Sequence, residues 1–392
     1  MGRIIIFTGK GGVGKSSTAA AHAVKAAAEG RRTLIVSTDM AHNLSDIFGV
    51  KLGEEPSAVL ENLDALEIDP NYEMSRHYGS ISAAIKGMLP SGENGIDAAA
   101  MEDMVVFPGI EELFALIRIR ELYDSGSYDL IIVDCAPTGE TLSLLKFPEL
   151  MSWYMEKLFP IGKAAMKVMR PIAKSMFKLE MPDNKAMNDI ERLYVELGRL
   201  QSLLRDRSVC SIRIVAIPEK MVVEESKRSY MYLNLFNFNV DGLYINRVLP
   251  EESENEFFSE WRTLQGRYIE ELNSAFGHLP LYTIKWYETD INGLDGLRRI
   301  GDDSLGDKAL FDVRCETSGE VYEKCDGGYT LTVRTPFADK SAFELYETGT
   351  DIVIKAGCFK RCIPLPNVLH NSSVTAAEMN GGRLVLTLRR QT

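Results

Sequence analysis

Short apolar runs alternate with longer, helix-like segments over roughly the first 300 residues of the chain. Each run is too short for a helix and ends at a polar or glycine-rich segment, which predicts a buried β-strand. The predicted strands are residues 4–7, 32–38, 63–68, 128–133, 211–217 and 242–246, of which 63–68 is the weakest. Because strands that alternate with helices form parallel sheets, the pattern predicts an α/β fold with a doubly wound, mostly parallel sheet.

The pattern changes near residue 300. Residues 298–307 are polar and contain glycine, and they are predicted to be a linker. Beyond them, short β-rich segments are separated by Gly, Asp, Pro and Asn, which predicts a small antiparallel all-β sandwich. These segments are residues 328–334, 343–346, 351–355, 358–365 and 383–389. We therefore expect two domains, 1–303 and 304–392.

Two stretches of the first domain, about 70–125 and 150–200, are predicted to be helical insertions. Residues 151–187 contain seven of the sixteen methionines, and their basic side chains recur at helical spacing. Those side chains are Lys163, Lys167, Arg170, Lys174 and Lys178. Methionine fills irregular cores and also lines adaptable binding surfaces. The stretch either packs on its own domain or binds varied apolar helices.

Residues 9–17 form a glycine-rich loop between the first predicted strand and the first predicted helix. Gly9, Gly14, Lys15 and Ser16 satisfy the pattern G-x-x-x-x-G-K-[S/T] of phosphate-binding loops. Glycines let successive backbone N–H groups turn toward a phosphate, and the helix N-terminus faces the same anion. The residues expected to bind the nucleotide are Gly9, Gly11, Gly12, Val13, Gly14, Lys15, Ser16 and Ser17. In such loops the lysine contacts the β- and γ-phosphates and the Ser16 hydroxyl contacts Mg²⁺, so ATP and Mg²⁺ are the expected cofactors.

Two carboxylates follow predicted strands. In open α/β sheets, ligands bind at the carboxyl ends of the strands, where Asp39 and Asp134 are expected. Asp134 is a candidate for holding Mg²⁺ with Ser16, directly or through a water. Asp39 is a candidate for orienting the attacking water and for holding the metal with Ser16 and Asp134, or it is a plain turn or helix cap.

Composition excludes some classes of function. The chain has 44 basic and 56 acidic residues, a net charge of −12, which argues against nucleic-acid binding. Six scattered cysteines without a C-x-x-C pair fit a reducing cytoplasm. No apolar run is long enough to span a membrane, and no leader pattern precedes the first strand. A cytoplasmic protein is therefore expected.

Three motifs in order resemble the ArsA-type ATPases, which include the arsenical-pump ATPase and the cytosolic targeting factor for tail-anchored membrane proteins. They are GKGGVGKSS at 9–17, STDMAHNLSD at 37–46 and DCAPTGET at 134–141. The resemblance implies a homodimer in which Lys10 reaches the partner's nucleotide. It also implies that Asp39 lies in switch I and Asp134 in switch II, and that Asn246 and Pro280 form the adenine pocket. The strand rhythm after residue 304, with the turn at 380–382, resembles the α-crystallin domain of small heat-shock proteins.

The chain departs from the family pattern in two places. In switch II it has Cys135 for a usual threonine and Glu140 for a usual histidine. Residues 251–276 contain no cysteine, whereas the eukaryotic targeting factor has a zinc-binding C-x-x-C in this stretch. A dimer of this chain cannot use that zinc clasp.

The sequence thus predicts a magnesium-dependent ATPase whose homodimer binds hydrophobic client segments according to its nucleotide state. One alternative is an arsenite-transporting pump ATPase, although arsenite needs converging thiolates and the ATPase half offers only Cys135 and Cys210. Another is a positioning switch of the MinD/ParA type. Those proteins bind membranes through a terminal amphipathic helix or bind DNA, which the terminal strand and the acidic charge disfavour.

Overall fold

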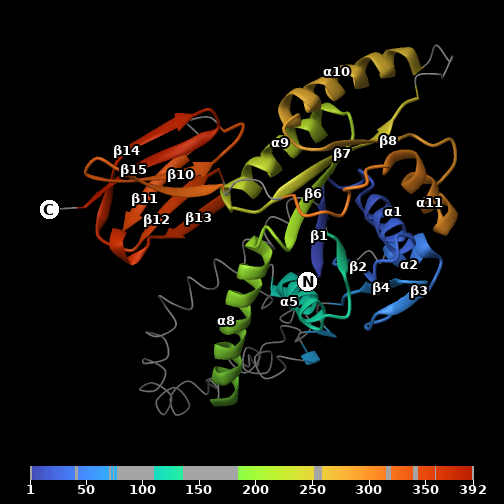
Figure 1. Cartoon of the computed structure of the whole chain (residues 1–392), viewed down its shortest axis with the longest axis horizontal. Coiled ribbons are helices and arrows are strands. Elements are labelled where there is room, and N and C mark those ends of the chain that lie inside the picture. The colour runs from blue at the N-terminus through green and yellow to red at the C-terminus, as the bar shows by residue number, and fades with distance from the viewer. Residues whose placement is uncertain are drawn as a thin grey trace, which may run out of the picture.

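The computed structural model describes residues 2–39, 43–69, 72–73, 75–76, 110–135, 184–250, 258–314, 319–338, 343–357 and 359–390. These residues form an N-terminal α/β domain and a C-terminal β domain, which lies beside the end of helix α9 (Figure 1). Residues 136–141, with Glu140, lie outside the described residues, as does the stretch 151–187 apart from its last four. No helix in the described part of the chain has the length and apolarity needed to cross a membrane.

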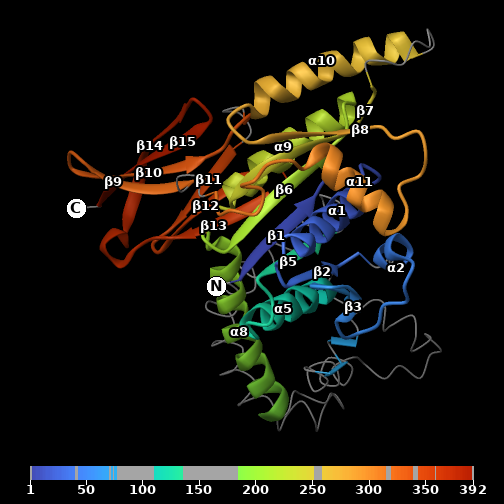
Figure 2. The same cartoon turned by 45° about the vertical axis from the view of Figure 1, so that its right-hand side comes forward.

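An eight-stranded sheet with the order β3-β4-β2-β5-β1-β6-β7-β8 forms the centre of the N-terminal domain (Figure 2). Its strands are β1 (Arg3–Thr8), β2 (Thr33–Ser37), β3 (Ser57–Leu60), β4 (Leu63–Glu67), β5 (Leu130–Asp134), β6 (Cys210–Ala216), β7 (Val240–Val248) and β8 (Leu281–Lys285). All neighbours are parallel except β3 and β4. The predicted doubly wound, mostly parallel sheet is confirmed, and all six predicted strands are present. The sequence analysis missed the two edge strands, β3 and β8, which are short and largely uncovered.

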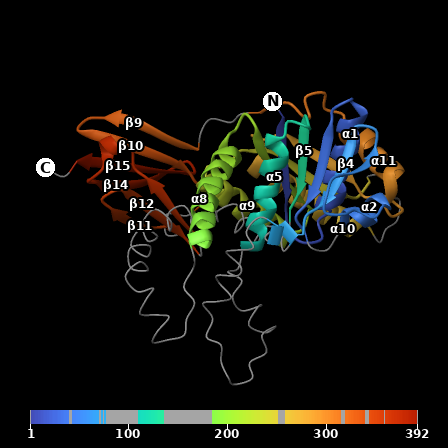
Figure 3. The same ribbon diagram turned by 90° about the horizontal axis from the view of Figure 1, so that it is seen from below.

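Helices cover both faces of this sheet, which explains why β1, β2, β5 and β6 are buried along their whole length. One face carries α1 (Lys15–Ala28), α2 (Asn43–Phe48) and α11 (Gly293–Ser304). The other carries α5 (Ile110–Asp124), α8 (Asn184–Arg205), α9 (Lys220–Leu235) and α10 (Ser259–Phe276). Figure 3 shows α1 and α11 on the side opposite α5 and α8. Helices α5 and α8 are the described parts of the two predicted insertions.

The predicted linker at 298–307 is wrong, because α11 extends to Ser304 and packs against α1. Leu297 and Ile300 are buried three positions apart on one face, while the acidic and basic residues that suggested a linker face solvent. The larger core then continues through Leu305 to Leu310 and Phe311. These residues pack on the sheet before the chain enters the β domain.

A buried ionic network holds this continuation against the sheet. Arg213 of β6 donates to Asp241 Oδ1 at 3.1 Å, and Arg3 of β1 donates to Asp241 Oδ2 at 2.5 Å. The same guanidinium groups donate to backbone carbonyls: Arg213 to Leu310, and Arg3 to Phe311 and Asp312. Since all three charged side chains are almost fully buried, their charges must be compensated inside the protein.

The C-terminal domain is an antiparallel sandwich, as predicted. A four-stranded sheet with the order β14-β15-β10-β9 faces a three-stranded sheet, β11-β12-β13. The strands are β9 (Glu320–Cys325), β10 (Gly328–Arg334), β11 (Phe343–Thr348), β12 (Asp351–Ala356), β13 (Phe359–Pro364), β14 (Ser372–Asn380) and β15 (Arg383–Arg390). A separate apolar core, which includes Leu331, Ile354 and Leu386, fills the space between them. The sequence analysis missed β9 and β14, in which most side chains are partly or fully exposed.

The two domains are packed against each other. Leu235, the last residue of α9, belongs to the apolar core of the β domain. Arg361 of β13 donates to the Leu235 carbonyl and forms an ion pair with Glu320. Asn237 accepts a hydrogen bond of 3.1 Å from the backbone N–H of Gly319. The end of α9 is therefore part of both domains.

Candidate functional site

The glycine loop connects the carboxyl end of β1 to the first residue of α1, as predicted. Gly12 and Gly14 have φ angles of 80° and 90°, in the left-handed region that favours glycine. A Cβ on Gly14 would lie 2.3 Å from Asn246 Nδ2, and a Cβ on Gly9 would lie 2.2 Å from the Val215 carbonyl oxygen. Both glycines are therefore required by the close approach of β6 and β7.

Lys15 is the first residue of α1, and its side chain is buried against the loop. Its ammonium donates to the carbonyl of Lys10 at 3.5 Å. Ser16 and Ser17 follow in the first turn and are partly exposed. The N–H groups of this turn have no partners within the helix, so the site offers donors and a fixed positive charge to a phosphate. Lys10 itself is half-buried and forms no ion pair with the described residues.

Three neighbouring strands end in buried polar side chains beside this loop. They are Thr8 of β1, Asp134 of β5 and Thr38, which follows β2. The register aligns Asp134 with Phe7 and Ser37, so all three lie at one edge of the sheet. Both Asp134 oxygens and both threonine hydroxyls are inaccessible to solvent, and no described residue hydrogen-bonds to them with good geometry.

Buried polar atoms in proteins are almost always hydrogen-bonded, so this cluster indicates a ligand or ion. The sequence analysis identified Asp134 and missed Thr8 and Thr38. Each of these threonines ends or directly follows a predicted apolar strand, and this position is the signal that could have identified it.

The electrostatics of Asp134 fit a cation. Burial raises its carboxyl pKa from the ordinary 3.8 to about 6, and the nearby Asp39 also raises it. The Ser16 hydroxyl and the Lys15 ammonium act in the opposite direction. A divalent cation would stabilise the ionised form of this carboxylate, and hydroxyl and carboxylate oxygens are ligands that Mg²⁺ prefers. The residues present therefore fit Mg²⁺.

Asp39 follows β2 at the same edge, as predicted. Its backbone N–H donates to the Ser37 hydroxyl at 3.1 Å, which fixes the turn after the strand. The carboxylate is partly exposed and close enough to Asp134 to raise that group's pKa. Its position is compatible with orienting water and with capping a turn.

The structure brings Asn246 to the loop and does not bring Pro280 there. The Asn246 side chain donates to the Val13 carbonyl at 2.8 Å and accepts from the Arg247 N–H, also at 2.8 Å. Pro280 precedes β8 and aligns with Gly242, four positions before Asn246 along β7, or roughly 13 Å. The residue of this region that reaches the loop edge is Trp286, which follows β8. The backbone N–H of Trp286 donates to the Val248 carbonyl at 2.8 Å, and the residue is 52% exposed.

Comparisons with known proteins agree with this geometry. Residues 2–305 match a family described as "Anion-transporting ATPase", and residues 326–388 match an "HSP20-like domain found in ArsA". A protein of Aquifex aeolicus named "Putative arsenical pump-driving ATPase 1" is 32% identical, over 98% of this chain and 99% of its own length. One of Chlorobaculum tepidum, "Putative arsenical pump-driving ATPase", is 33% identical over 93% and 90% of the two chains. "ATPase ASNA1 homolog 1" of Paramecium tetraurelia is 29% identical over 76% and 90%.

The glycine loop with its buried lysine, the matched families and the ATPase-named relatives lead to one conclusion. The chain is an ATPase that belongs to the ArsA family and carries the HSP20-like domain found in that family.

Proposed function

We propose that the protein hydrolyses ATP with Mg²⁺ as a cytoplasmic homodimer and uses its nucleotide state to control the binding of hydrophobic client segments. The observation that carries the catalytic part is the cluster of buried polar atoms of Thr8, Thr38 and Asp134 beside the glycine loop. A bound cation and the oxygens of a phosphate would provide partners for these atoms.

The proposal gives each residue of the site a role. Lys15 and the backbone amides of the loop bind the phosphates, and Asn246 holds the loop through Val13. Ser16 and Asp134 would hold Mg²⁺, which when bound neutralises charge on the phosphate oxygens. Asp39 orients the attacking water, and Lys10 acts on the nucleotide of a second subunit.

Replacing Asp134 with asparagine is expected to stabilise the metal-free protein and abolish its response to Mg²⁺. Because the folded-state pKa is raised, ionised Asp134 destabilises the fold at high pH. The folded protein then gains stability as pH falls through about 6, where it takes up a proton that the unfolded chain does not. At about pH 8 we expect D134N to increase the free energy of unfolding by on the order of 2 kcal/mol.

Denaturant unfolding with and without MgCl₂ and ATP measures this change. D134N should lose the added stability that the metal gives and should have a flatter pH dependence than the unmodified protein between about pH 7 and 5. Asp290→Asn, an exposed aspartate after β8, is the control and should behave like the unmodified protein. Unchanged Mg²⁺ stabilisation in D134N would contradict the metal assignment.

Exposed apolar side chains support a dimer at the nucleotide edge. Met221 lies in the first turn of α9, Trp261 lies in the first turn of α10 and Trp286 follows β8, so all three lie where chain segments leave the carboxyl ends of the strands. They are 71%, 51% and 52% exposed. A second subunit that faces this edge would cover them and bring its Lys10 to the site.

The client surface is proposed from the methionine-rich stretch 151–187 and from the relatives named ASNA1 homologues. A fluorescent peptide with an apolar helix should bind the full chain in one nucleotide state and not the other. The triple variant Met166→Ser, Met169→Ser and Met176→Ser should lose this binding and keep ATPase activity. Val368→Ser, which changes an apolar residue of the β domain that is 69% exposed, is the control. Failure of the peptide to bind with ATP, with ADP or without nucleotide would exclude this part of the proposal.

The arsenite pump remains the second candidate because similar chains carry that name. Two features disfavour it. Cys210 begins β6 whereas Cys135 follows the end of β5, so the two thiols lie toward opposite edges of the sheet. Burial also raises the pKa of the Cys210 thiol, and metalloid binding needs the thiolate. Stimulation of ATP hydrolysis by arsenite that is lost in C135S or C210S would favour the pump.

A further inference from the structure

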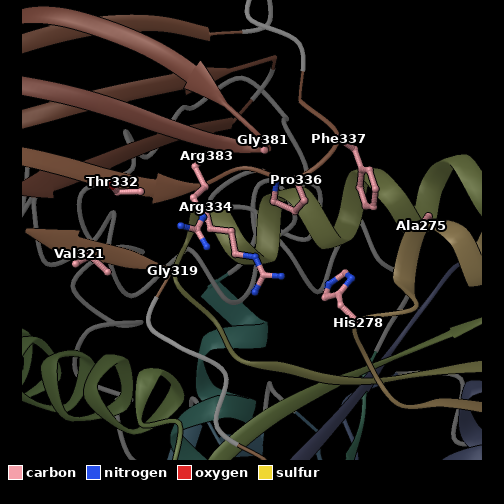
Figure 4. A pocket seen from close by; sticks show the side chains of 11 residues that line it. Ala275, His278, Gly319, Val321, Thr332, Arg334, Pro336, Phe337, Gly381 and Arg383 are labelled. Atoms are coloured by element: carbon pink, nitrogen blue, oxygen red, sulfur yellow. The ribbon is translucent and has the colours of Figure 1, made fainter.

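A hollow of about 680 Å³ lies where the β domain meets the ATPase domain (Figure 4). Ala275 and His278, from the end of α10 and the approach to β8, form one side, and residues of β9, β10 and β15 form the other. Since His278 precedes β8, the hollow lies toward the amino ends of the strands. The glycine loop follows the carboxyl end of β1, so the hollow is separate from the nucleotide site.

The described lining of the hollow is basic. Among the described residues it contains two arginines and one histidine but no acidic residue, although the chain has 56 acidic and 44 basic residues. Arg334 of β10 and Arg383 of β15 are directly opposite each other in the antiparallel register. Like charges in this arrangement repel and are destabilising. Arg383 is exposed and has no ion pair with the described residues, so an anion beside Arg383 would offset its charge.

Contacts across the domain boundary orient the cationic groups. The guanidinium carbon of Arg334 lies 5.8 Å from the centre of the Tyr230 ring. The Tyr230 hydroxyl is 2.6 Å from His278 Nε2. Figure 4 shows the Arg334 side chain extending toward His278, with the guanidinium of Arg383 on its other side. Nitrogen donors from both domains therefore face a common space.

The hollow also has an apolar wall. The Phe337 ring packs edge-on against Phe276 with 5.5 Å between ring centres, yet 47% of Phe337 is exposed. Its φ of 62° is costly for a bulky residue. Pro336 and Val321 complete this wall. A ligand that fits the hollow therefore has both a charged group and an apolar part.

We propose that the hollow binds a small phosphate ester, which Arg334 and Arg383 hold from the β domain and His278 holds from the ATPase domain. Guanidinium groups match phosphate oxygens in bidentate geometry. The volume falls in the range of about 300–1,000 Å³ that is common for small-molecule sites. The apolar part of the ester lies against Phe337. A bound ligand would join the two domains at a point remote from the ATPase site.

Calorimetric titration of the full chain, saturated with ADP to fill the glycine loop, tests this site. The probe is inorganic pyrophosphate, with citrate as a carboxylate of similar charge. We expect one pyrophosphate per chain and weaker binding of citrate. Because a hydrogen bond to a charged group contributes about 1.5–3 kcal/mol, R383Q should weaken pyrophosphate binding by about tenfold or more. H278Q should also weaken it, since His278 contributes from the other domain.

Arg389→Gln is the matched control, because Arg389 is exposed on the same strand opposite Ser373. R389Q should bind pyrophosphate as the unmodified protein does. An equal loss in R389Q and R383Q would show diffuse attraction and overturn the site. Absence of pyrophosphate binding, or equal binding of citrate, would overturn the phosphate assignment.

Discussion

Replacing Lys10 with alanine is expected to reduce ATP turnover by about 10³-fold or more while ATP binding changes little. Lys10 is half-buried beside the loop, and none of the described residues forms an ion pair with it. Within the chain, the Lys10 carbonyl accepts a hydrogen bond from the Lys15 ammonium, and in the proposed function Lys15 is the phosphate ligand. A cationic side chain supplied by a second subunit stabilises transition-state charge in the manner of an arginine finger. Steady-state hydrolysis and nucleotide titration measure the two effects separately.

A mixture of two inactive variants distinguishes action across the dimer from action within one subunit. In a mixed dimer of K10A and K15A, the K10A subunit keeps Lys15 and receives Lys10 from its partner. One of the two sites is then complete, so mixing should restore turnover well above the sum of the separate variants. Lys51→Ala, an exposed lysine after α2, is the control and should not change turnover. Unaltered turnover in K10A would refute a role of Lys10 in hydrolysis. If mixing the two variants restored no turnover, Lys10 would act in the site of its own subunit.

Replacing Asp241 with alanine is expected to have the largest effect on stability. Asp241 is fully buried and bonded to both Arg3 and Arg213, which are themselves almost fully buried. The variant leaves two like charges in the core without an acidic partner. Removing one partner of a buried ion pair costs about 3–5 kcal/mol, and we expect a loss of at least this size in the free energy of unfolding.

Asp129→Ala is the matched control for that experiment. Asp129 pairs with Arg32 at 2.9 Å, but both side chains are about half exposed, so solvent screens the pair. Its denaturation midpoint should remain close to that of the unmodified protein. If D241A and D129A had similar midpoints, the buried network would not contribute to stability as we argue.

Local patterns predicted the centre of the fold and of the site. The glycine loop, its flanking strand and helix, and the carboxylates after β2 and β5 are each specified by a few adjacent residues. Their convergence follows from the rule that parallel strands present their carboxyl ends at one edge. The register adds what no local pattern contains: it puts Thr8 and Thr38 next to Asp134.

Long-range contacts explain how Asn246, named from the family resemblance, meets the loop, and they explain the parts of the fold that the sequence analysis did not predict. Asn246 reaches the loop by a bond to Val13, 233 residues away, and Pro280 is kept from the edge by the register of β8 on β7. The linker prediction gave composition more weight than the spacing of Leu297 and Ile300.

Strands β9 and β14 lack the strict alternation of apolar and polar residues that marks a strand. Two apolar residues are adjacent in each, Val321–Tyr322 and Ala376–Ala377, and β14 has a register shift between Val374 and Ala376.

The hydrogen bonds of Arg3 also affect when the chain can fold during synthesis and where it can be truncated. Arg3 is synthesised almost first, but its acceptors at Asp241 and Phe311 follow 238 and 308 residues later. The middle of the sheet cannot complete its polar contacts until most of the protein has left the ribosome, and contacts of such sequence separation form slowly. A fragment that ends near residue 305 would lack the carbonyls of Leu310, Phe311 and Asp312. An independently expressed ATPase half should therefore extend at least through Asp312.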